Sequence, residues 1–573
     1  MTPESVDEIV FLDFEFIADT GEKPRPICMV AMEQRSGRIV RIWLEHERPK
    51  VPPFTVGPKV LTVAYFASAE LGCYMALGWR FPRLVLDLYA EFRVATNGLF
   101  LPHGRGLLGA MQWFGRDGIT ASRKDHLRKR ILAGGPFGAE EQQAILDYCQ
   151  SDVEALPDLY RHIITDDTNL IPALWRGEYM KVVAAAEYTG VPVDAALYHQ
   201  MVERWPALQC KVIERVNATI PVFENGHFRS ARFEHWLRNQ GLLVQWPVTP
   251  TGELALDDDT FRDAAALYPQ IEPLRHARQM LGQMHRPDLS VGGDGRNRCL
   301  LSPYATKTGR NAPSTSKFIF GMPSFLRQLI RPELGRALAY VDWDQQEFGI
   351  AAALSGDSAM LSAYSSGDPY LSFAVYAGAV PPGATKEEYP RERALFKTTI
   401  LGTQYLIGAN GLGYKLGITL QEAEDLLEHH HRIFPRFWLW SDAVSDYGQL
   451  HGELTAAFGW RMQVSSATSL RTLRNFPMQA NGAEMLRLGC ILTADAGVRV
   501  LAPVHDAVLI EANEPEIEHA VSVTKSAMQK ASEMVLAGFP LRTEARIIRP
   551  PNRLLEERGI ATWNWILESL KPV

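Results

Sequence analysis

Short apolar segments that carry carboxylates are the feature that most limits the folds open to this chain. EIVFLDFEF (residues 8–16), RALAYVDW (336–343) and LAPVHDAVLIEA (501–512) have the length and apolar content of buried strands, and long helical patterns separate them. The chain has 573 residues, more than one hydrophobic core usually supports. We therefore expect an α/β protein with several domains.

The order of the predicted elements divides the chain into regions. In the first 165 residues, the strands EIVFLDFEF, CMVAMEQ and RIVRIWLE precede a helical apolar pattern at 139–163, which predicts an α/β unit. A polar break at 165–170 precedes a mainly helical region that reaches residue 300. Beyond it, strands alternate with long helices, which predicts a second α/β assembly with a large helical insertion.

Composition leaves nucleic acid open as a partner and argues against a membrane protein. The net charge is −7, but a protein binds a duplex through a local basic surface. Carboxylates that hold metal ions add negative charge elsewhere, so the net charge does not exclude DNA binding. No apolar run approaches the roughly 20 residues that span a bilayer. The first residues lack a basic stretch followed by an apolar one, so we expect no secretory signal. The six cysteines form no CxxC pair, so we expect reduced thiols in a cytosolic protein.

A first group of functional side chains lies in the N-terminal region. Asp13 and Glu15 are two residues apart in the first strand, so they point to the same face, where a divalent cation would relieve their repulsion. Tyr148 and Asp152 are four residues apart in the predicted helix, which places the hydroxyl beside the carboxylate. An exposed sheet face explains most such strand pairs, but the apolar neighbours of Asp13 favour a site at the edge of a core.

Asp342 and Asp506 form a second possible pair. Asp342 closes the strand RALAYVDW, and Asp506 lies in LAPVHDAVLIEA, which we expect to be another strand. A carboxylate buried at a strand end is costly unless it is paired or bound to a metal. Each aspartate alone could simply cap a strand, and their spacing along the chain does not establish that they meet.

Between these aspartates, Arg393, Lys397, Leu401 and Tyr405 recur every four residues and so form one slanted stripe on a helix. The two positively charged side chains near the start of the stripe can bind a triphosphate, and the apolar and aromatic groups further along can stack on a base. A basic helix face with an aromatic residue is more often only solvated. The patterns around the two aspartates decide between these alternatives.

Several patterns in one order resemble the family A DNA polymerases, of the bacterial polymerase I type. VDWDQQEFGIAAALSGD resembles their first palm motif, PVHDAV their third, and the stripe from Arg393 to Tyr405 their fingers helix. Thr308-Gly309-Arg310 resembles the segment that touches the primer strand, and RNFPMQANGAEML the helix whose glutamine reads the minor groove near the primer end. The N-terminal DxE and YxxxD patterns resemble the DEDD-type 3′→5′ proofreading exonucleases. The similarity covers nearly the whole chain.

This resemblance implies an RNase H-like exonuclease domain followed by a right-hand polymerase domain. The expected limits are 1–165 for the exonuclease, 166–300 for linker helices and thumb, 301–366 for the first part of the palm, 367–450 for the fingers and 451–573 for the rest of the palm. Because the exonuclease motif begins at residue 13, we expect no 5′-nuclease domain, a large-fragment layout similar to that of phage enzymes. We expect a monomer in the cytoplasm of a bacterial or phage-infected cell.

The resemblance also implies a reaction in which a primer 3′-hydroxyl attacks a deoxynucleoside triphosphate. Asp342 and Asp506 would hold two Mg²⁺ ions, for which Mn²⁺ is expected to substitute. Lys397 would also act as an acid toward pyrophosphate. The dNTP-binding residues implied are Arg393, Lys397, Leu401, Tyr405, Glu347, Gln345 and Arg327, with Glu347 excluding a ribose 2′-hydroxyl. The residues implied to contact the primer-template are Arg310, Arg471, Gln479 and His505.

For the exonuclease, the resemblance implies that Asp13, Glu15 and Asp152 hold two metal ions and that Tyr148 orients the attacking water at a single-stranded DNA 3′ end. The family usually has Asn and, four residues later, Asp, where this chain has Phe66 and Glu70. We expect Glu70 to be the fourth ligand, with Asp87 as a competitor. The alternative is that Glu70 is a surface residue and the exonuclease is weak or lost. The basic run at 122–130 is either a solvated helix or a single-strand contact.

Three further positions depart from the family pattern. Leu401 stands in place of Phe or Tyr, Ala507 in place of Glu and Tyr370 in place of His, and we expect these changes to tune rate and fidelity without removing catalysis. Two competing functions remain. One is an exonuclease-only protein with a polymerase-like DNA-binding domain, and the other is a non-catalytic DNA-binding protein.

Overall fold

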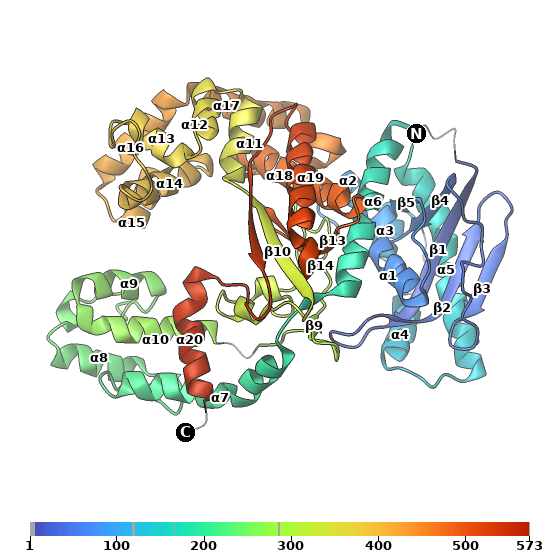
Figure 1. The fold of residues 1–573 in the computed structure, drawn as a ribbon, viewed down its shortest axis with the longest axis horizontal. Coiled ribbons are helices and arrows are strands. Elements are labelled where there is room, and N and C mark those ends of the chain that lie inside the picture. The colour runs from blue at the N-terminus through green and yellow to red at the C-terminus, as the bar shows by residue number, and fades with distance from the viewer. Residues whose placement is uncertain (1–5, 117–120, 166, 285–286, 572–573) are drawn as a thin grey trace. The chain divides into compact units, whose positions relative to one another are not determined.

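The computed structural model describes residues 6–116, 121–165, 167–284 and 287–571, which form two compact units (Figure 1). The first unit contains residues 1–190, 300–313 and 334–549, and the second contains residues 191–299, 314–333 and 550–573. Residues 550–571, which we expect in the palm, group with the second unit in this division, and the expected domain limits stay a prediction. Motif spacing gives no information on which distant segments pack together.

A five-stranded sheet in the order β3-β2-β1-β4-β5 forms the centre of the N-terminal region. β1, β2 and β3 pair antiparallel, whereas β4 and β5 extend the sheet parallel to β1. The first three strands confirm the predicted ones to within a few residues. The strands span Glu8–Ile17 (β1), Arg25–Glu33 (β2), Ile39–Trp43 (β3), Val60–Ala64 (β4) and Leu84–Asp87 (β5).

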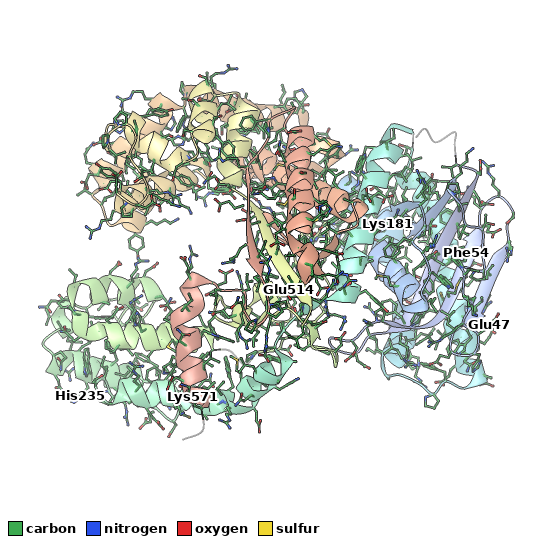
Figure 2. All side chains as sticks on the ribbon, in the orientation of Figure 1. Glu47, Phe54, Lys181, His235, Glu514 and Lys571 are labelled. Atoms are coloured by element: carbon green, nitrogen blue, oxygen red, sulfur yellow. The ribbon has the colours of Figure 1, made fainter. Side chains whose placement is uncertain are left out.

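The two faces of this sheet pack against different helices, because successive residues of a strand point to opposite sides. Phe11 of β1 packs with α5 (Ala139–Ile163), whereas Phe14 packs with α1 (Ala67–Leu77). Phe54, labelled in Figure 2, belongs to the same apolar cluster as Phe14. The limits of α5 are those that the apolar pattern predicts.

Helix α6 joins the N-terminal sheet to the rest of the first unit. Its Gly177 lies so close to the edge strand β5 that a Cβ atom there would meet the Val85 carbonyl oxygen. Lys181 of α6, labelled in Figure 2, donates a hydrogen bond to the Arg83 carbonyl oxygen at 2.8 Å. The remaining helices of this region are α2 (Leu88–Thr96), α3 (Leu107–Trp113), α4 (Ala121–Leu132) and α6 (Asp167–Thr189).

A four-stranded antiparallel sheet in the order β13-β14-β10-β15 forms the centre of the C-terminal half of the first unit. β10 confirms the predicted strand, but the prediction of one strand for LAPVHDAVLIEA is wrong, because it forms the hairpin β13–β14. His505, with a φ of 55°, lies in the tight turn, which an apolar pattern alone does not reveal. The strands span Arg336–Trp343 (β10), Arg499–Val504 (β13), Ala507–Asn513 (β14) and Thr543–Ile548 (β15).

The predicted helical insertion between β10 and β13 is confirmed. It ends in α18, which is buried over most of its length and packs against α11, α17 and α19. Its helices span Gln346–Ser355 (α11), Ser358–Ser365 (α12), Pro369–Tyr376 (α13), Pro390–Gln404 (α14), Ala409–Leu416 (α15), Leu420–Ile433 (α16), Pro435–His451 (α17) and Leu470–Asp495 (α18). The hairpin of β11 (Glu453–Thr455) and β12 (Arg461–Gln463) precedes α18, and α19 (Ile517–Val535) follows β14.

The second unit is mainly helical, as predicted for residues 170–300. Phe233, Trp246 and Phe261 form part of its core, with ring centroids 4.9–5.3 Å apart. Its helices span Ala195–Asn217 (α7), Ser230–Asn239 (α8), Asp258–Leu267 (α9), Glu272–Gln283 (α10) and Ile560–Leu570 (α20), with short strand pairs Val191–Pro192 and Arg296–Asn297 (β6, β9), and Phe223–Glu224 and His227–Phe228 (β7, β8). Across the described residues, no helix combines the length and apolarity needed to cross a membrane.

Candidate functional site

Asp342 and Asp506 lie side by side at one end of the four-stranded sheet. Asp342 in β10 pairs with Ala507 of β14 on one side and with Glu544 of β15 on the other. Asp506 directly precedes Ala507 in the hairpin turn, and its carbonyl oxygen accepts a hydrogen bond from the Trp343 N–H at 3.2 Å. The strand register therefore brings together two aspartates that are far apart in the sequence.

Burial and mutual repulsion both act on these carboxylates. The pKa of Asp342 is raised to about 6, first by burial and then by the negative charges of Asp506 and Glu544. Burial also raises the pKa of Asp506, whereas the nearby positive charges of His505 and Arg310 act against that rise. Two partly buried carboxylates that repel each other fit a hard divalent cation such as Mg²⁺, which would favour their charged forms.

An open pocket of about 760 Å³ adjoins the two aspartates. Arg393 and Lys397 of α14 lie near the ring of Tyr370, with the Arg393 guanidinium carbon 5.5 Å and the Lys397 Nζ 5.7 Å from the ring centroid. Oxygen donors for metal ions and positive charges for phosphates therefore share one cavity. The residues that line it are Asp342, Trp343, Asp344, Gln345, Gln346, Glu347, Tyr370, Arg393, Lys397, Leu401 and Asp506.

Asp368 holds the guanidinium of Arg393 at the pocket wall. The Arg393 Nε donates to the Asp368 carboxylate, whose other oxygen accepts hydrogen bonds from the N–H groups of Tyr370 and Leu371 and so caps α13. A phosphate that binds Arg393 would therefore compete with an acidic partner. Sequence reasoning missed Asp368, although an aspartate before Pro369 is typical of a helix N-cap.

Tyr405 directly follows α14 and contacts two other predicted site residues. Its hydroxyl donates a hydrogen bond to the Glu347 carboxylate, and it is also hydrogen-bonded to Gln479 of α18. Burial, and then the charge of Glu347, raise the pKa of Tyr405. Three residues from three separate segments thus meet beside the pocket.

The predicted DNA-contacting residues lie in different surroundings. The positive charge of Arg310 is close enough to Asp506 and Tyr405 to act on the pKa of both, and His505 adjoins Asp506 in the hairpin turn. Arg471, at the start of α18, is exposed and donates to the Leu406 carbonyl oxygen at 3.3 Å.

Arg327 belongs to the second unit. Its Nη2 donates to the Phe320 carbonyl oxygen at 2.8 Å, and its Nη1 lies 3.7 Å from a carboxylate oxygen of Glu556. These contacts are internal to that unit. Its expected contact with the nucleotide stays a prediction.

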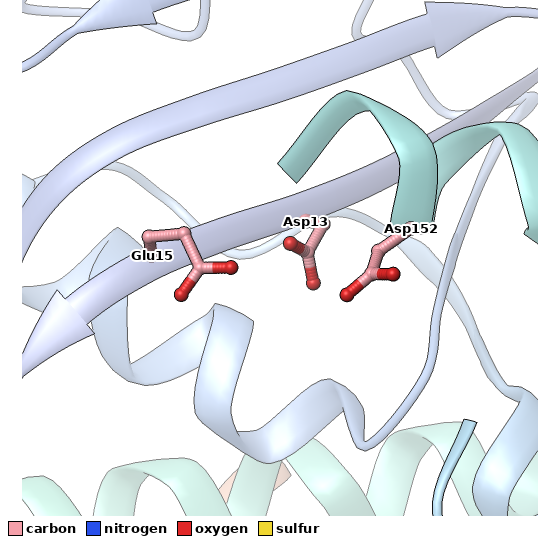
Figure 3. Close-up of side chains that lie close together, drawn as sticks. All are labelled: Asp13, Glu15 and Asp152. Carbon is pink, nitrogen blue, oxygen red and sulfur yellow. The ribbon is translucent and has the colours of Figure 1, made fainter. Parts of the chain in front are cut away.

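A second acidic cluster lies between β1 and α5. Asp13, Glu15 and Asp152 point toward one another (Figure 3), and one carboxylate oxygen of each lies within 4.8 Å of the others. Burial, and then charges that include those of Asp13 and Asp152, raise the pKa of Glu15, and Arg128 of α4 opposes this. Three acids in so small a space offer the oxygen ligands that Mg²⁺ prefers.

Glu70 of α1 faces the same cluster. Its side chain is only 5% exposed, and burial, followed by the charges of Asp13 and Glu15, raises its pKa. Its Oε2 has no hydrogen-bond partner in the described part of the chain. This burial contradicts the alternative in which Glu70 is a surface residue. A buried carboxylate oxygen that has no hydrogen-bond partner and lies beside two other acids is expected of a metal ligand in a structure without the metal ion.

Asp87, the competitor of Glu70 for the ligand role, is hydrogen-bonded to the backbone at the starts of two helices. Its Oδ1 accepts hydrogen bonds from the N–H of Phe66 at 2.9 Å and from that of Tyr89 at 2.8 Å, so it joins the starts of α1 and α2. Phe66 has a φ of 74° in this arrangement. Burial raises the pKa of Asp87 to about 7. These contacts favour a structural role for Asp87 over a role as a metal ligand.

Tyr148 lies where the four-residue spacing predicts. Its hydroxyl is hydrogen-bonded to Asp152, and burial, followed by the charge of Asp152, raises its pKa. The basic run at 122–130 lies in α4, but the side chains of 122–125 lie outside the described residues. Arg128 is exposed, and its positive charge is close enough to the acidic cluster to lower the pKa of Glu15. Arg130 forms a salt bridge with Glu141.

Sequence reasoning also missed charged residues around the polymerase-like pocket. Asp344 lines the pocket and pairs with Arg542, whose Nη2 lies 3.3 Å from the Asp344 Oδ2 and 2.8 Å from the Gln345 Oε1. Asp344 directly follows β10, and its position two residues beyond Asp342 in the sequence could have indicated it. Glu544 and Arg542 could be found only from the strand register, because no motif surrounds them.

Comparisons with known proteins give one family model and several relatives. Residues 313–549 match the model of DNA polymerase family A. DNA polymerase I, thermostable, of Thermus thermophilus is 28% identical over 392 residues, which are 64% of this chain and 46% of that protein. DNA polymerase I of Aquifex aeolicus is 25% identical over 391 residues, 64% of this chain and 65% of that protein. The chain thus spans about half to two-thirds of the length of these relatives.

A solved structure shares the fold. The POL domain of Pol1 from M. smegmatis, in complex with DNA primer-template and dNTP, superposes with a TM-score of 0.72 at 19% sequence identity, covering 94% of this chain and 95% of that one.

Proposed function

We propose that this chain is a template-directed DNA polymerase that adds deoxynucleotides to a primer 3′-hydroxyl, because residues 313–549 match the model of DNA polymerase family A. The observation that carries the proposal is the pairing of Asp342 with the Asp506 turn beside a pocket that also contains Arg393 and Lys397. Acidic ligands and phosphate-binding cations in one cavity suit nucleotidyl transfer better than DNA binding alone.

In this proposal each residue of the pocket has a separate role in nucleotide addition. Two Mg²⁺ ions held by Asp342 and Asp506 would activate the primer hydroxyl and stabilise the charge that develops on the phosphate. Arg393 and Lys397 bind the triphosphate, and Lys397 donates a proton to the leaving pyrophosphate. Tyr405 lies beneath the nascent base pair. Arg310, His505 and Gln479 contact the primer-template, and Gln345 and Leu401 complete the nucleotide site.

Glu347 provides a test of sugar selection. Its carboxylate is held by the Tyr405 hydroxyl at the pocket wall, where it would crowd a 2′-hydroxyl. We expect Glu347→Ala to raise ribonucleotide incorporation relative to deoxyribonucleotide incorporation by about 10- to 100-fold, measured as the ratio of kcat/KM values. Glu347→Gln, which retains most of the bulk, should change this ratio much less. An unaltered ratio in Glu347→Ala would show that another residue selects the sugar.

We also propose that the Asp13–Glu15–Asp152 cluster is a 3′→5′ proofreading exonuclease site. Three acids and the Glu70 carboxylate would hold the metal ions, and Tyr148, bound to Asp152, would orient the attacking water at the 3′ end of a single strand. The close packing of ligands from β1, α1 and α5 supports this proposal.

The fourth ligand can be tested by substitution at Glu70. If Glu70 binds a metal ion, Glu70→Gln should lower single-strand excision by about 10- to 100-fold, because the amide lacks the negative charge and one of the two oxygens of the carboxylate. Glu70→Asp, which restores the residue usual in the family, should retain most of the activity. Equal excision by Glu70→Gln and the unaltered chain would exclude Glu70 from the ligand set.

One assay separates the proposed function from its competitors. A 5′-labelled primer on a longer template is incubated with Mg²⁺, with and without dNTPs. We expect extension when dNTPs are present and shortening when they are absent. Shortening under both conditions would indicate an exonuclease-only protein, and binding without any change in primer length would indicate a non-catalytic DNA-binding protein.

A further inference from the structure

Helix α2 of the N-terminal region contacts the segment that precedes Thr308-Gly309-Arg310. Arg93, which is 1% exposed, donates from its Nε to the Tyr304 carbonyl oxygen at 3.1 Å and from its Nη2 to the Ala305 carbonyl oxygen at 3.3 Å. Asn97, at the end of the helix, donates from its Nδ2 to the Lys307 carbonyl oxygen at 2.6 Å. Three of the four carbonyl oxygens from residue 304 to residue 307 are therefore bound by α2 side chains.

The end of α2 is also fixed against the polymerase domain. The Asn97 Nδ2 donates to the Arg461 carbonyl oxygen at 2.8 Å, and the Asn97 carbonyl oxygen accepts from the Gln463 N–H at 2.8 Å. Gly98 follows with a φ of 94°, and a Cβ atom there would lie 2.3 Å from the Gln463 carbonyl oxygen. Only glycine permits so close an approach, so α2 and β12 meet backbone to backbone.

Residues of the polymerase domain hold the segment from its other side. Trp460 donates from its Nε1 to the Lys307 carbonyl oxygen at 3.0 Å, and Arg487 donates from its Nη1 to the Gly309 carbonyl oxygen at 2.6 Å. A Cβ atom on Gly309 would lie 2.9 Å from the Trp460 ring. The segment is thus enclosed between α2, Trp460 and α18.

The far end of this enclosed segment reaches the polymerase-like site. Arg310 acts electrostatically on Asp506 and on Tyr405, and its Nε is buried without a hydrogen-bond partner among the described residues. Its backbone N–H is fixed by the Thr306 hydroxyl at 2.9 Å. The direction of the Arg310 side chain therefore depends on a backbone that α2 holds in place.

We propose that Arg93 and Asn97 are positioning residues for polymerisation: from the N-terminal region, they fix the backbone of residues 304–307 and thereby place Arg310 for contact with the primer. This inference rests on the proposed polymerase function. It gives α2 a role in primer binding that is separate from excision at the acidic cluster.

The test uses the full chain with three substitutions. Arg93→Ala removes the Arg93 hydrogen bonds to Tyr304 and Ala305, and Asn97→Ala removes the Asn97 hydrogen bond to Lys307, while the donors Arg105 and Trp460 remain. Thr96→Val is the matched control, because it removes a buried hydrogen bond within α2, from the Thr96 hydroxyl to the Phe92 carbonyl oxygen at 2.7 Å, and leaves the hydrogen bonds of Arg93 and Asn97 to the segment in place. Hydrogen exchange at the amides of Thr306, Gly309 and Arg310 reports the order of the segment. Fluorescence anisotropy and steady-state extension report primer-template binding, the KM for dNTP and kcat.

We expect faster exchange at these amides in Arg93→Ala and Asn97→Ala, and primer-template affinity about fivefold weaker or more, with kcat and the KM for dNTP within twofold of the unaltered chain. Excision of single-stranded DNA should not change, and Thr96→Val should match the unaltered chain in every assay. Unchanged exchange, or faster exchange with unchanged primer-template affinity, would overturn the inference. A loss of affinity in Thr96→Val as large as in Asn97→Ala would also overturn it. If the unaltered chain itself neither binds nor extends a primer-template, the proposed function fails, which is a separate outcome.

Discussion

Asp342→Asn and Asp506→Asn should each lower the rate of primer extension by about 10³-fold or more, because each substitution removes an oxygen ligand from the centre at which the charge of the transition state develops. The measurement is single-turnover incorporation of one dNMP in Mg²⁺. Asp446→Asn, on the exposed face of α17, is the matched control and should extend primers like the unaltered chain.

A loss of extension in Asp342→Asn should not reflect unfolding. The pKa of Asp342 in the folded chain, about 6, lies above that of an unfolded aspartate, so the folded state binds a proton more tightly. The free energy of unfolding therefore falls as the pH rises from about 4 through 6. Asparagine does not ionise, so the Asp342→Asn chain does not lose this stability. In metal-free buffer at pH 7 we expect the Tm of Asp342→Asn to equal or exceed that of the unaltered chain. Full extension by the folded Asp342→Asn chain would contradict the assignment of the site.

Substitutions in the Asp13–Glu15–Asp152 cluster should lower excision and leave primer extension intact. Asp13→Ala combined with Glu15→Ala should lower excision from a single-stranded 3′ end by about 10³-fold or more, because two of the ligands from β1 are lost. Extension of a matched primer should stay within twofold, and the yield of extended product should rise when dNTPs are scarce. The measurement is release of the labelled 3′-terminal nucleotide in Mg²⁺ without dNTPs.

Glu154→Gln is the control for this cluster. Glu154 lies two residues beyond Asp152 on the exposed face of α5, so its substitution should leave excision intact. If the double alanine chain excises as fast as the Glu154→Gln chain, another site in the protein carries the nuclease activity, and the metal-binding assignment of Asp13 and Glu15 is wrong.

Local spacing predicted the parts of both sites that lie on one element. The two-residue spacing of Asp13 and Glu15 and the four-residue spacing of Tyr148 and Asp152 each place two groups on one face, and the structure has both pairs as expected. The stripe from Arg393 to Leu401 likewise lines one pocket. Such predictions succeed because the periods of a strand and a helix are fixed by backbone geometry.

Contacts between distant segments could not be predicted in this way. The neighbours of Asp342 depend on the register of β14 and β15, and Glu544 enters its surroundings only through that register. The hairpin turn at His505 requires a left-handed backbone conformation that the apolar pattern does not signal. Burial of Glu70 depends on how α1 packs against β1, and the contacts of Arg93 with Tyr304 join segments more than 200 residues apart.

The most direct test of the central claim is single-nucleotide incorporation by the Asp13→Ala, Glu15→Ala chain, in which excision cannot mask extension. Four templates that differ only in the base opposite the incoming nucleotide are each offered the four dNTPs separately, with Mg²⁺ and then with excess EDTA. We expect only the complementary nucleotide to be added efficiently on each template, and no addition with EDTA. Addition that ignores the template base, or no addition in Mg²⁺ by a chain that binds the primer-template, would contradict the claim that Asp342 and Asp506 form the centre of a template-directed polymerase.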